Sequence, residues 1–405
     1  MKIESIRNNK DSETPAQVLR VIWQNPCGFW TTPQTYFTVH ERFTSADVVH
    51  NNRVHLIAIT SKCATFAEVD CDILDVRKYP FTWFAQKSHT TKLIILPIHV
   101  FDELVDKIDI SNRKVVWMFH TARCGSTAWA QVFNALPGWT AYSEPHAMLY
   151  SITYGDHGYC SAEQYSKSPE YKKFAVSAIK MLLSYPPEGN SIFWKTTSYE
   201  EYLIDVISEY FPQHQMLIAY RDSFASISSY FRSFYDDNYL RMIEKALQHD
   251  PEDDDWWFHI PNAGCFTNGF DHNFCKKVIR KVRPKTALEW YCFLWSAKVV
   301  VLNRFIDKGA KILPVKYDSL LENKRETVAK LFSYLNISAE NVDVACEALN
   351  YDSQAGVAMV SWESRRKGDA LNWSKDADVV RRCNMILEAF HLPDLSTTLT
   401  FANSI

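Results

Sequence analysis

The residues best suited to chemistry in this sequence stand where an apolar run gives way to small polar residues. Residues 115–119 are such a run, and Thr121-Ala122-Arg123-Cys124-Gly125-Ser126-Thr127 follows one residue later. A strand that passes through such a turn into a helix points backbone N–H groups and the helix N-terminus at one spot. The guanidinium of Arg123 and the hydroxyls of Ser126 and Thr127 add further donors. The segment therefore predicts a loop that binds a phosphate-like anion.

Two common kinds of anion loop do not match this segment. An ATPase or GTPase loop of the form GxxxxGK[ST] requires a lysine before the hydroxyl residue, and Gly125 stands before Ser126. Cys124 would fit a phosphatase only if an arginine closed the loop six residues later, but that position is Ala130. A turn with a purely structural role stays open as the alternative.

A second candidate anion site follows the apolar run 216–220. Arg221 comes directly after this run, at the expected carboxyl end of a strand, where open α/β sheets bind ligands. Ser229 lies in the following helical stretch, close enough to share an anion with the guanidinium. Arg366-Lys367-Gly368 adds a third basic element near the C-terminus. The alternatives are a carboxylate partner for Arg221 and a solvated surface for residues 365–367.

The elements that must position these residues are indicated by alternating strand and helix patterns. Strands are expected at 115–119, 139–142, 191–195, 216–220 and 311–315, with helices at 200–211, 224–234 and 326–335. This alternation predicts a parallel sheet covered on both faces. We expect an α/β fold with a P-loop-like parallel sheet flanked by helices over residues 111–405. A β-rich N-terminal appendage is expected over residues 1–110, and an irregular insertion at about 235–284.

Composition excludes several classes of protein. The 405 residues carry 44 Lys and Arg against 47 Asp and Glu, so no overall positive field favours nucleic acid. The hydrophobic fraction of 47% with 22% charged residues is that of a globular protein. Ten cysteines without CxxC pairs, a polar N-terminus and the lack of an apolar run of about 18 residues predict a soluble cytoplasmic protein with no integral membrane segment. Cys265, His272 and Cys275 fit no common zinc spacing, so no metal is expected.

On four segments the chain resembles the sulfotransferases that use 3'-phosphoadenosine 5'-phosphosulfate (PAPS). The loop 121–127 is similar to the family's 5'-phosphosulfate loop, and residues 315–321 are similar to its Tyr-Glu-Asp-Leu strand. Arg221 and Ser229, eight residues apart, are similar to the family's pair that holds the 3'-phosphate. Arg366-Lys367-Gly368 resembles the family's late Arg-Lys-Gly, which also reaches that phosphate. The resemblance implies a site that binds PAPS, releases adenosine 3',5'-bisphosphate and requires no metal. The residues implied for donor binding are Arg123, Cys124, Gly125, Ser126, Thr127, Arg221, Ser229, Arg366, Lys367 and Gly368.

The sequence departs from the family pattern at the catalytic base. Cytosolic members have a Lys-Thr-His segment whose histidine is the base, and Lys195-Thr196-Thr197 stands in the matching place. Some carbohydrate-type members use a glutamate in a Glu-Pro segment, which is similar to Ser143-Glu144-Pro145-His146. We therefore favour Glu144 as the base over His146 and His120, with a loop or capping carboxylate as the alternative. Arg123, with Lys195, is expected to neutralise the leaving phosphate.

Two further departures concern the donor site. Cys124 replaces the usual serine of the loop, and Trp129 stands one position later than the tryptophan that stacks on adenine in many members. The implied activity is transfer of a sulfuryl group from PAPS to a hydroxyl or amine of a small molecule or carbohydrate. The alternatives are a P-loop kinase-like enzyme, disfavoured by the missing lysine, and a non-catalytic nucleotide-binding module. Trp256, Trp257 and Phe258 are candidates for a pocket wall or for lid packing.

Overall fold

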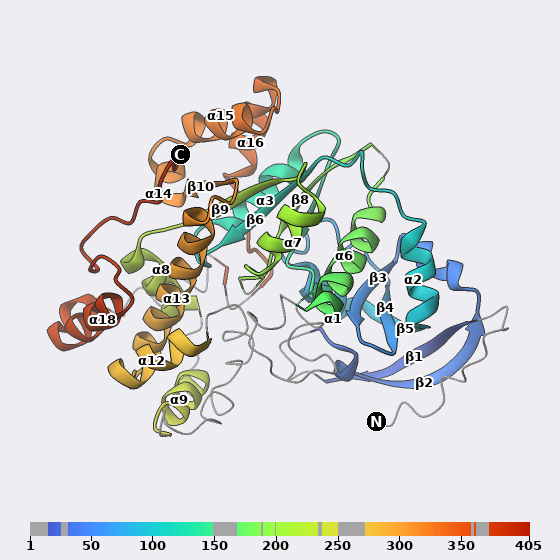
Figure 1. The fold of residues 1–405 in the computed structure, drawn as a ribbon, viewed down its shortest axis with the longest axis horizontal. Coiled ribbons are helices and arrows are strands. Elements are labelled where there is room, and N and C mark those ends of the chain that lie inside the picture. Colours follow the sequence, from blue (N-terminus) through green and yellow to red (C-terminus); the bar gives the residue numbers. More distant parts are fainter. Residues whose placement is uncertain are drawn as a thin grey trace.

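The protein is seen in a computed structural model, in which two five-stranded sheets organise the chain (Figure 1). The structure describes residues 15–25, 31–148, 168–187, 189–198, 200–233, 237–249, 272–357, 360–361 and 372–405. Trp256, Trp257, Phe258 and Cys265 lie outside the described residues.

The first sheet is antiparallel and is formed by the N-terminal part of the chain. Its strands are β1 (Ala16–Gln24), β2 (Tyr36–Thr44), β3 (Val54–Ile59), β4 (Cys63–Val69) and β5 (Thr90–Pro97), in the order β2-β1-β5-β4-β3. Every residue of β3 is buried, which agrees with a strand covered on both faces. The expected β-rich N-terminal unit is therefore confirmed.

The second sheet is parallel and carries the strands expected from the sequence. They are β6 (Val115–His120), β7 (Trp139–Ser143), β8 (Ser191–Lys195), β9 (Gln215–Tyr220) and β10 (Ile312–Lys316). Their order is β10-β9-β6-β8-β7, and all four strand pairs are parallel. The predicted α/β fold class, a parallel sheet flanked by helices, is confirmed.

Helices cover both faces of the parallel sheet (Figure 1). The described helices are α1 (Thr82–His89), α2 (Ile98–Asp106), α3 (Ser126–Ala135), α6 (Pro169–Ser184), α7 (Leu203–Tyr210), α8 (Ser223–Ser233), α9 (Asp237–Ala246), α12 (His272–Val282), α13 (Ala287–Asp307), α14 (Tyr317–Glu322), α15 (Lys324–Tyr334), α16 (Val342–Ala348) and α18 (Ala377–Ala389). None of these helices is long and apolar enough to cross a membrane.

The central strand β6 is apolar from Val115 to Phe119, and the packing on its two faces explains why. Val115, Trp117 and Phe119 face one buried cluster, which includes side chains of α6, α7 and α13. Val116 and Met118 face the opposite cluster, with side chains of α3, α15 and α16. Successive side chains of a strand point to opposite faces, so a strand covered on both sides must be apolar at every position.

The two sheets share one buried core. Leu56 and Phe66 of the antiparallel sheet belong to the same apolar cluster as Trp117 and Trp194 of the parallel sheet. Helix α6 lies between the sheets in Figure 1 and contacts β3. The division of the chain into units 1–110 and 111–405 remains a prediction, but the N-terminal unit packs tightly against the rest of the protein.

The range 235–284, expected to be irregular, contains two helices in its described parts. Helix α9 buries Leu240 and Ile243, and helix α12 buries Val278 and Val282. These side chains recur at helical spacing and join the main core. The expectation missed them because the acidic run and the aromatic cluster between the two helices dominated that part of the sequence.

The buried histidine of β3 gives the protein a dependence of stability on pH. His55 lies edge-on to the ring of Tyr185, with 5.0 Å between ring centroids. Burial lowers the pKa of His55 from 6.5 to about 4. In the unfolded chain His55 takes up a proton below about pH 6.5, whereas in the folded protein the same ring stays neutral down to about pH 4. The stability contributed by the neutral ring is therefore present above pH 6.5 and is lost as the pH falls towards 4.

We expect wild-type protein to lose roughly 2–3 kcal/mol more unfolding free energy than His55→Phe between pH 7 and pH 4. Phenylalanine keeps an aromatic ring beside Tyr185 and cannot be protonated. Urea unfolding at both pH values measures the difference. An equal loss in the two proteins would show that His55 does not carry this dependence.

Candidate active site

Four side chains singled out from the sequence lie along one edge of the parallel sheet. Arg221 directly follows β9, Arg123 lies in the loop after β6, Lys195 is the last residue of β8, and Glu144 directly follows β7. These strands are neighbours in the order β9-β6-β8-β7, and all run parallel. Their carboxyl ends therefore meet at one edge, which is where open α/β sheets bind ligands.

The loop after β6 has the geometry of an anion cradle. Gly125 is the N-cap of α3, adopts a left-handed conformation with φ of 77°, and provides no side chain to cap the helix. Ser126 and Thr127 form the start of the helix, so its positive end faces the loop. A Cβ atom at Gly125 would lie 2.1 Å from the ring of Tyr317. Glycine is thus required here both by the backbone and by the close approach of a ring.

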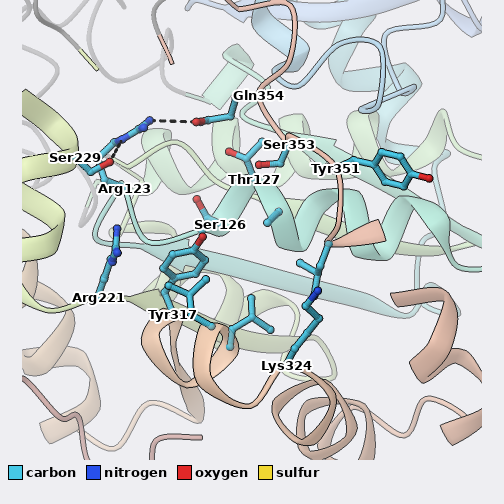
Figure 2. Close-up of a pocket in the computed structure, with 15 residues that line it drawn as sticks. Arg123, Ser126, Thr127, Arg221, Ser229, Tyr317, Lys324, Tyr351, Ser353 and Gln354 are labelled. Carbon is cyan, nitrogen blue, oxygen red and sulfur yellow. Dashed lines mark hydrogen bonds between the residues drawn. The ribbon is translucent and has the colours of Figure 1, made fainter. Parts of the chain in front are cut away.

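Six of the predicted donor residues line a single pocket. Its cavity has a volume of about 310 Å³. The lining residues are Arg123, Gly125, Ser126, Thr127, Ala128, Arg221, Ser229, Tyr317, Leu320, Leu321, Lys324, Leu349, Tyr351, Ser353 and Gln354. Figure 2 shows Arg123, Arg221 and Ser229 at one side of this pocket and Lys324 and Tyr351 at the other. The pocket therefore combines arginines and hydroxyls with a lysine and with leucine and tyrosine side chains.

The two anion sites expected from the sequence touch each other. The Arg123 Nε donates to the hydroxyl of Ser229 at 3.1 Å, and Arg123 Nη1 lies 3.5 Å from the Gln354 side-chain oxygen (Figure 2). Arg123 and Arg221 thus act on one region of the pocket. An anionic ligand with two charged groups would meet both arginines.

The carboxylate partner considered for Arg221 is present. Its Nε lies 3.5 Å from an oxygen of Asp318, and its guanidinium lies 5.0 Å from the ring centre of Tyr317. Asp318 and Tyr317 follow β10 directly. The ion pair and the ring together hold Arg221 at the rim of the pocket, which it still lines.

Glu144 and Lys195 form an ion pair beside this pocket. The Lys195 Nζ donates to Glu144 Oε1, and the Glu144 backbone N–H donates to the Lys195 carbonyl at 2.9 Å. The Lys195 side chain is 1% exposed and that of Glu144 is 18% exposed. Burial lowers the pKa of Lys195, the charge of Glu144 opposes this shift, and the Arg123 guanidinium adds to it. The last effect places Lys195 within electrostatic reach of the anion loop.

The two candidate histidines are both buried. His120 accepts from the Ala122 backbone N–H at 3.1 Å through Nδ1, and its Nε2 lies 2.9 Å from the Thr196 carbonyl, so this nitrogen carries the proton. Burial lowers its pKa well below the usual range. His146 lies parallel to Trp83, with 5.2 Å between ring centroids, and burial lowers its pKa as well. Glu144 is the more exposed of the three candidate bases.

Two residues of the predicted donor loop and helix face the core. The Cys124 thiol donates to the Ala219 carbonyl at 3.1 Å, and burial raises its pKa. This environment disfavours the reactive thiolate. Trp129 is fully buried in the cluster of α3 and does not line the pocket. Neither side chain is placed to contact a ligand there.

Arg366, Lys367 and Gly368 lie outside the described residues. Beyond them, Trp373 donates its indole N–H to Ser228 at 3.1 Å. Ser228 is next to Ser229, a residue of the pocket. The chain therefore returns to the site shortly after the predicted basic segment.

Several pocket residues carried no signal in the sequence. Residues 315–321 are similar to the family's strand motif, and this similarity gives no role to Tyr317. In the structure the Tyr317 ring covers the anion loop at Gly125. Lys324, Tyr351 and Gln354 come from the C-terminal helical region and reach the pocket only through folding. The exposed ring of Tyr351 and the leucine side chains give the pocket apolar surface. Trp129, which was compared with the family's adenine-stacking tryptophan, gives it none.

Three of the seven non-glycine residues with a positive φ in the described part of the chain lie at this edge of the sheet. Ala122, Arg123 and Glu144 all have positive φ angles, of 61°, 53° and 58°. Such angles are costly for residues other than glycine and persist where surrounding contacts enforce them. The two loops that carry Arg123 and Glu144 are therefore held in specific conformations.

A group of buried charges lies within electrostatic reach of the ion pair. Burial raises the pKa of Glu200 to about 8 and that of Glu201 to about 7, and lowers that of Lys298 to about 7. The charge of Glu144 adds to the upward pKa shift of Glu200 and opposes the downward pKa shift of Lys298. Charge interactions are strong in such a weakly solvated region.

Comparison with known proteins gives likenesses of fold. No protein-family model and no curated protein sequence matches the chain. A sulfotransferase from Alicyclobacillus acidocaldarius matches 69% of this chain and 97% of its own, with 11% identity and a TM-score of 0.32. A sulfotransferase from Mycobacterium avium matches 73% of this chain and 82% of its own, with 10% identity and a TM-score of 0.37.

Proposed function

We propose that this protein is a sulfotransferase that moves a sulfuryl group from PAPS to a hydroxyl or amine of a small molecule or carbohydrate. The observation that carries the proposal is the convergence of Arg123, Arg221, Ser126, Thr127 and Ser229 on one pocket. PAPS is an elongated anion with charged groups at both the 5' and 3' positions of one nucleoside. A pocket lined by two arginines, several hydroxyls and apolar side chains suits such a molecule.

Different pocket residues would bind different parts of the donor. Ser126, Thr127 and the N-terminus of α3 would hold the 5'-phosphosulfate together with Arg123. Arg221 and Ser229 would hold the 3'-phosphate. Leucine side chains and the ring of Tyr351 would contact the adenine. Arg366, Lys367 and Gly368 stay predicted donor contacts.

Sulfuryl transfer then needs a base and a group that neutralises the leaving phosphate. The acceptor oxygen or nitrogen attacks the sulfur, and the bond between sulfur and the bridging phosphate oxygen breaks. The electron pair of that bond stays on the oxygen of adenosine 3',5'-bisphosphate, and the acceptor proton passes to Glu144. Arg123 and Lys195 would neutralise the charge that grows on the leaving phosphate; contacts with Ser229 and Glu144 hold their side chains.

The donor site can be tested by calorimetric titration with adenosine 3',5'-bisphosphate, ADP and ATP, each with and without Mg²⁺. We expect the bisphosphate to bind best and without metal. Preference for ATP with Mg²⁺ would instead indicate a kinase-like enzyme. Binding of the bisphosphate without release of product from PAPS, on a panel of phenol, alcohol, sugar and amine acceptors, would indicate a non-catalytic module.

Replacing Arg221 with alanine tests the proposed 3'-phosphate contact. We expect the dissociation constant for adenosine 3',5'-bisphosphate to rise roughly 10- to 150-fold, because a charge-assisted hydrogen bond worth about 1.5–3 kcal/mol is lost. Arg325→Ala is the matched control, because Arg325 also pairs with an aspartate but lies exposed on α15. Equal affinities of Arg221→Ala and wild type would remove this contact from the proposal.

A further inference from the structure

We propose that Trp83, on helix α1 of the N-terminal unit, is a positioning residue for the candidate base Glu144. The role assigned to Trp83 rests on the proposed function, because it acts through the carboxylate that would accept the proton. The N-terminal unit would then form part of the active site, although it carries none of the donor-binding residues.

The contact itself joins the two halves of the chain. The Trp83 indole Nε1 donates to Glu144 Oε2 at 3.3 Å, and Lys195 donates to the other carboxylate oxygen. The carboxylate is thus held at both oxygens, by Trp83 of helix α1 in the N-terminal unit and by Lys195 of β8. A carboxylate fixed in this way keeps the direction from which it can take a proton.

Trp83 is itself held in place on both sides. One face of its ring lies against His146, with the two rings only 7° from parallel. The ring also stacks with Phe81 at 5.8 Å between centroids. The Trp83 carbonyl accepts from the hydroxyl of Thr31 at 2.6 Å. Because these contacts fix both the ring and the backbone, the indole N–H has one direction in which to point.

The segment before Trp83 is fastened to the strand that leads to Glu144. The Ser143 backbone N–H donates to the Thr82 hydroxyl at 3.2 Å, and the Ser143 hydroxyl donates to the Pro80 carbonyl at 2.6 Å. All of these groups are buried. The two segments, more than sixty residues apart, therefore move as one, and the strained φ of Glu144 lies directly beside this junction.

Phe81 acts on the other member of the ion pair. The Lys195 Nζ lies 4.9 Å from the centre of the Phe81 ring, within the range of a cation–π contact. Phe81 and Trp83 also form an apolar cluster with Val357 and Val360, which follow the pocket residue Gln354. The N-terminal segment thus contacts the base, its lysine partner and the chain that leads from the donor pocket.

The test compares wild type, Trp83→Phe, Glu144→Gln and the double variant. Phenylalanine keeps an aromatic ring against His146 and removes the N–H donor together with the second ring of the indole. We expect Trp83→Phe to lower kcat for release of the bisphosphate from PAPS by about tenfold, with the best acceptor of the panel, and to leave the bisphosphate dissociation constant unchanged. In the Glu144→Gln background, Trp83→Phe should cause no further loss, because the two residues act as one unit.

Trp139→Phe is the matched control, because Trp139 lies at the opposite end of β7 from Glu144. The contact can also be read without turnover, from the indole N–H resonance of Trp83 in ¹⁵N-labelled protein. That signal is identified by its loss in Trp83→Phe and should shift in Glu144→Gln.

The possible outcomes separate the two proposals. Three results would each overturn the positioning role. In the first, the losses of kcat in the two single variants multiply in the double variant. In the others, kcat is unchanged in Trp83→Phe, or the indole signal has the same position in Glu144→Gln as in wild type. Failure of wild type to bind the bisphosphate would overturn the proposed function, whatever the indole signal shows.

Discussion

Glu144→Gln is expected to lower kcat for sulfuryl transfer about 100- to 10,000-fold, because the acceptor proton loses the base that takes it. Glutamine has nearly the same shape as glutamate, so the change removes the negative charge with little change in volume. Its one side-chain oxygen can accept from Lys195 or from Trp83, each of which has its own oxygen on the carboxylate. Binding of adenosine 3',5'-bisphosphate should stay within about twofold of wild type, since Glu144 does not line the donor pocket. Steady-state kinetics and calorimetry on the same preparations measure both quantities.

Two controls make the result specific to the base. Glu144→Asp keeps the charge on a shorter side chain and should lose less activity than Glu144→Gln. The glutamine variant also leaves the buried Lys195 without a charged partner, so thermal unfolding must show that it is folded at the assay temperature. Turnover equal to wild type in Glu144→Gln would assign the base to another residue.

Gly125→Ala is expected to weaken bisphosphate binding by on the order of 100-fold, or about 2.7 kcal/mol. The added Cβ would lie 2.1 Å from the ring of Tyr317, so the ring or the loop must move. Alanine also tolerates the left-handed backbone poorly at a φ of 77°. Because this loop forms the start of α3 and the 5' end of the proposed donor site, its displacement removes several contacts at once. Calorimetric titration measures the loss.

Gly138→Ala separates backbone strain from crowding. Gly138 has a similar φ of 71°, but a Cβ there would meet nothing within 4 Å. It should lose about 1 kcal/mol of stability and no affinity. Crowding against the Tyr317 ring should also lower the stability of Gly125→Ala. The double variant Gly125→Ala/Tyr317→Ala lacks this ring and should recover part of that stability. If Gly125→Ala binds as tightly as wild type, the loop after β6 is not the donor site.

These predictions depend on both sheets of the molecule. The parallel sheet supplies Arg123, Arg221, Lys195 and Glu144 at one edge. The antiparallel unit supplies Trp83, which reaches across to the base. The shared core makes this possible, because rigid packing between the two parts of the chain can hold a side chain of one against the candidate base in the other.

Much of the fold follows from local sequence patterns. The runs at 115–119, 192–194 and 216–220 are apolar at every position, as a strand covered on both faces requires, and the structure places strands there. Small residues after the run 115–119 predict the turn into α3. The apolar run 216–220 predicts a strand, so Arg221 is expected at the end of that strand. Helices α9 and α12 had a helical pattern that the charged and aromatic residues between them obscured.

The sequence by itself determined the strand and helix types, the parallel sheet and the residues at the strand ends, because apolar periodicity and turn residues act over short stretches of chain. Only the tertiary structure decided that Arg123 touches Ser229, that the ring of Tyr317 covers Gly125, and that Trp83 donates to Glu144. Each of these contacts joins residues tens to hundreds of positions apart. Their geometry depends on the strand order and on the packing of the two sheets, which no short segment specifies.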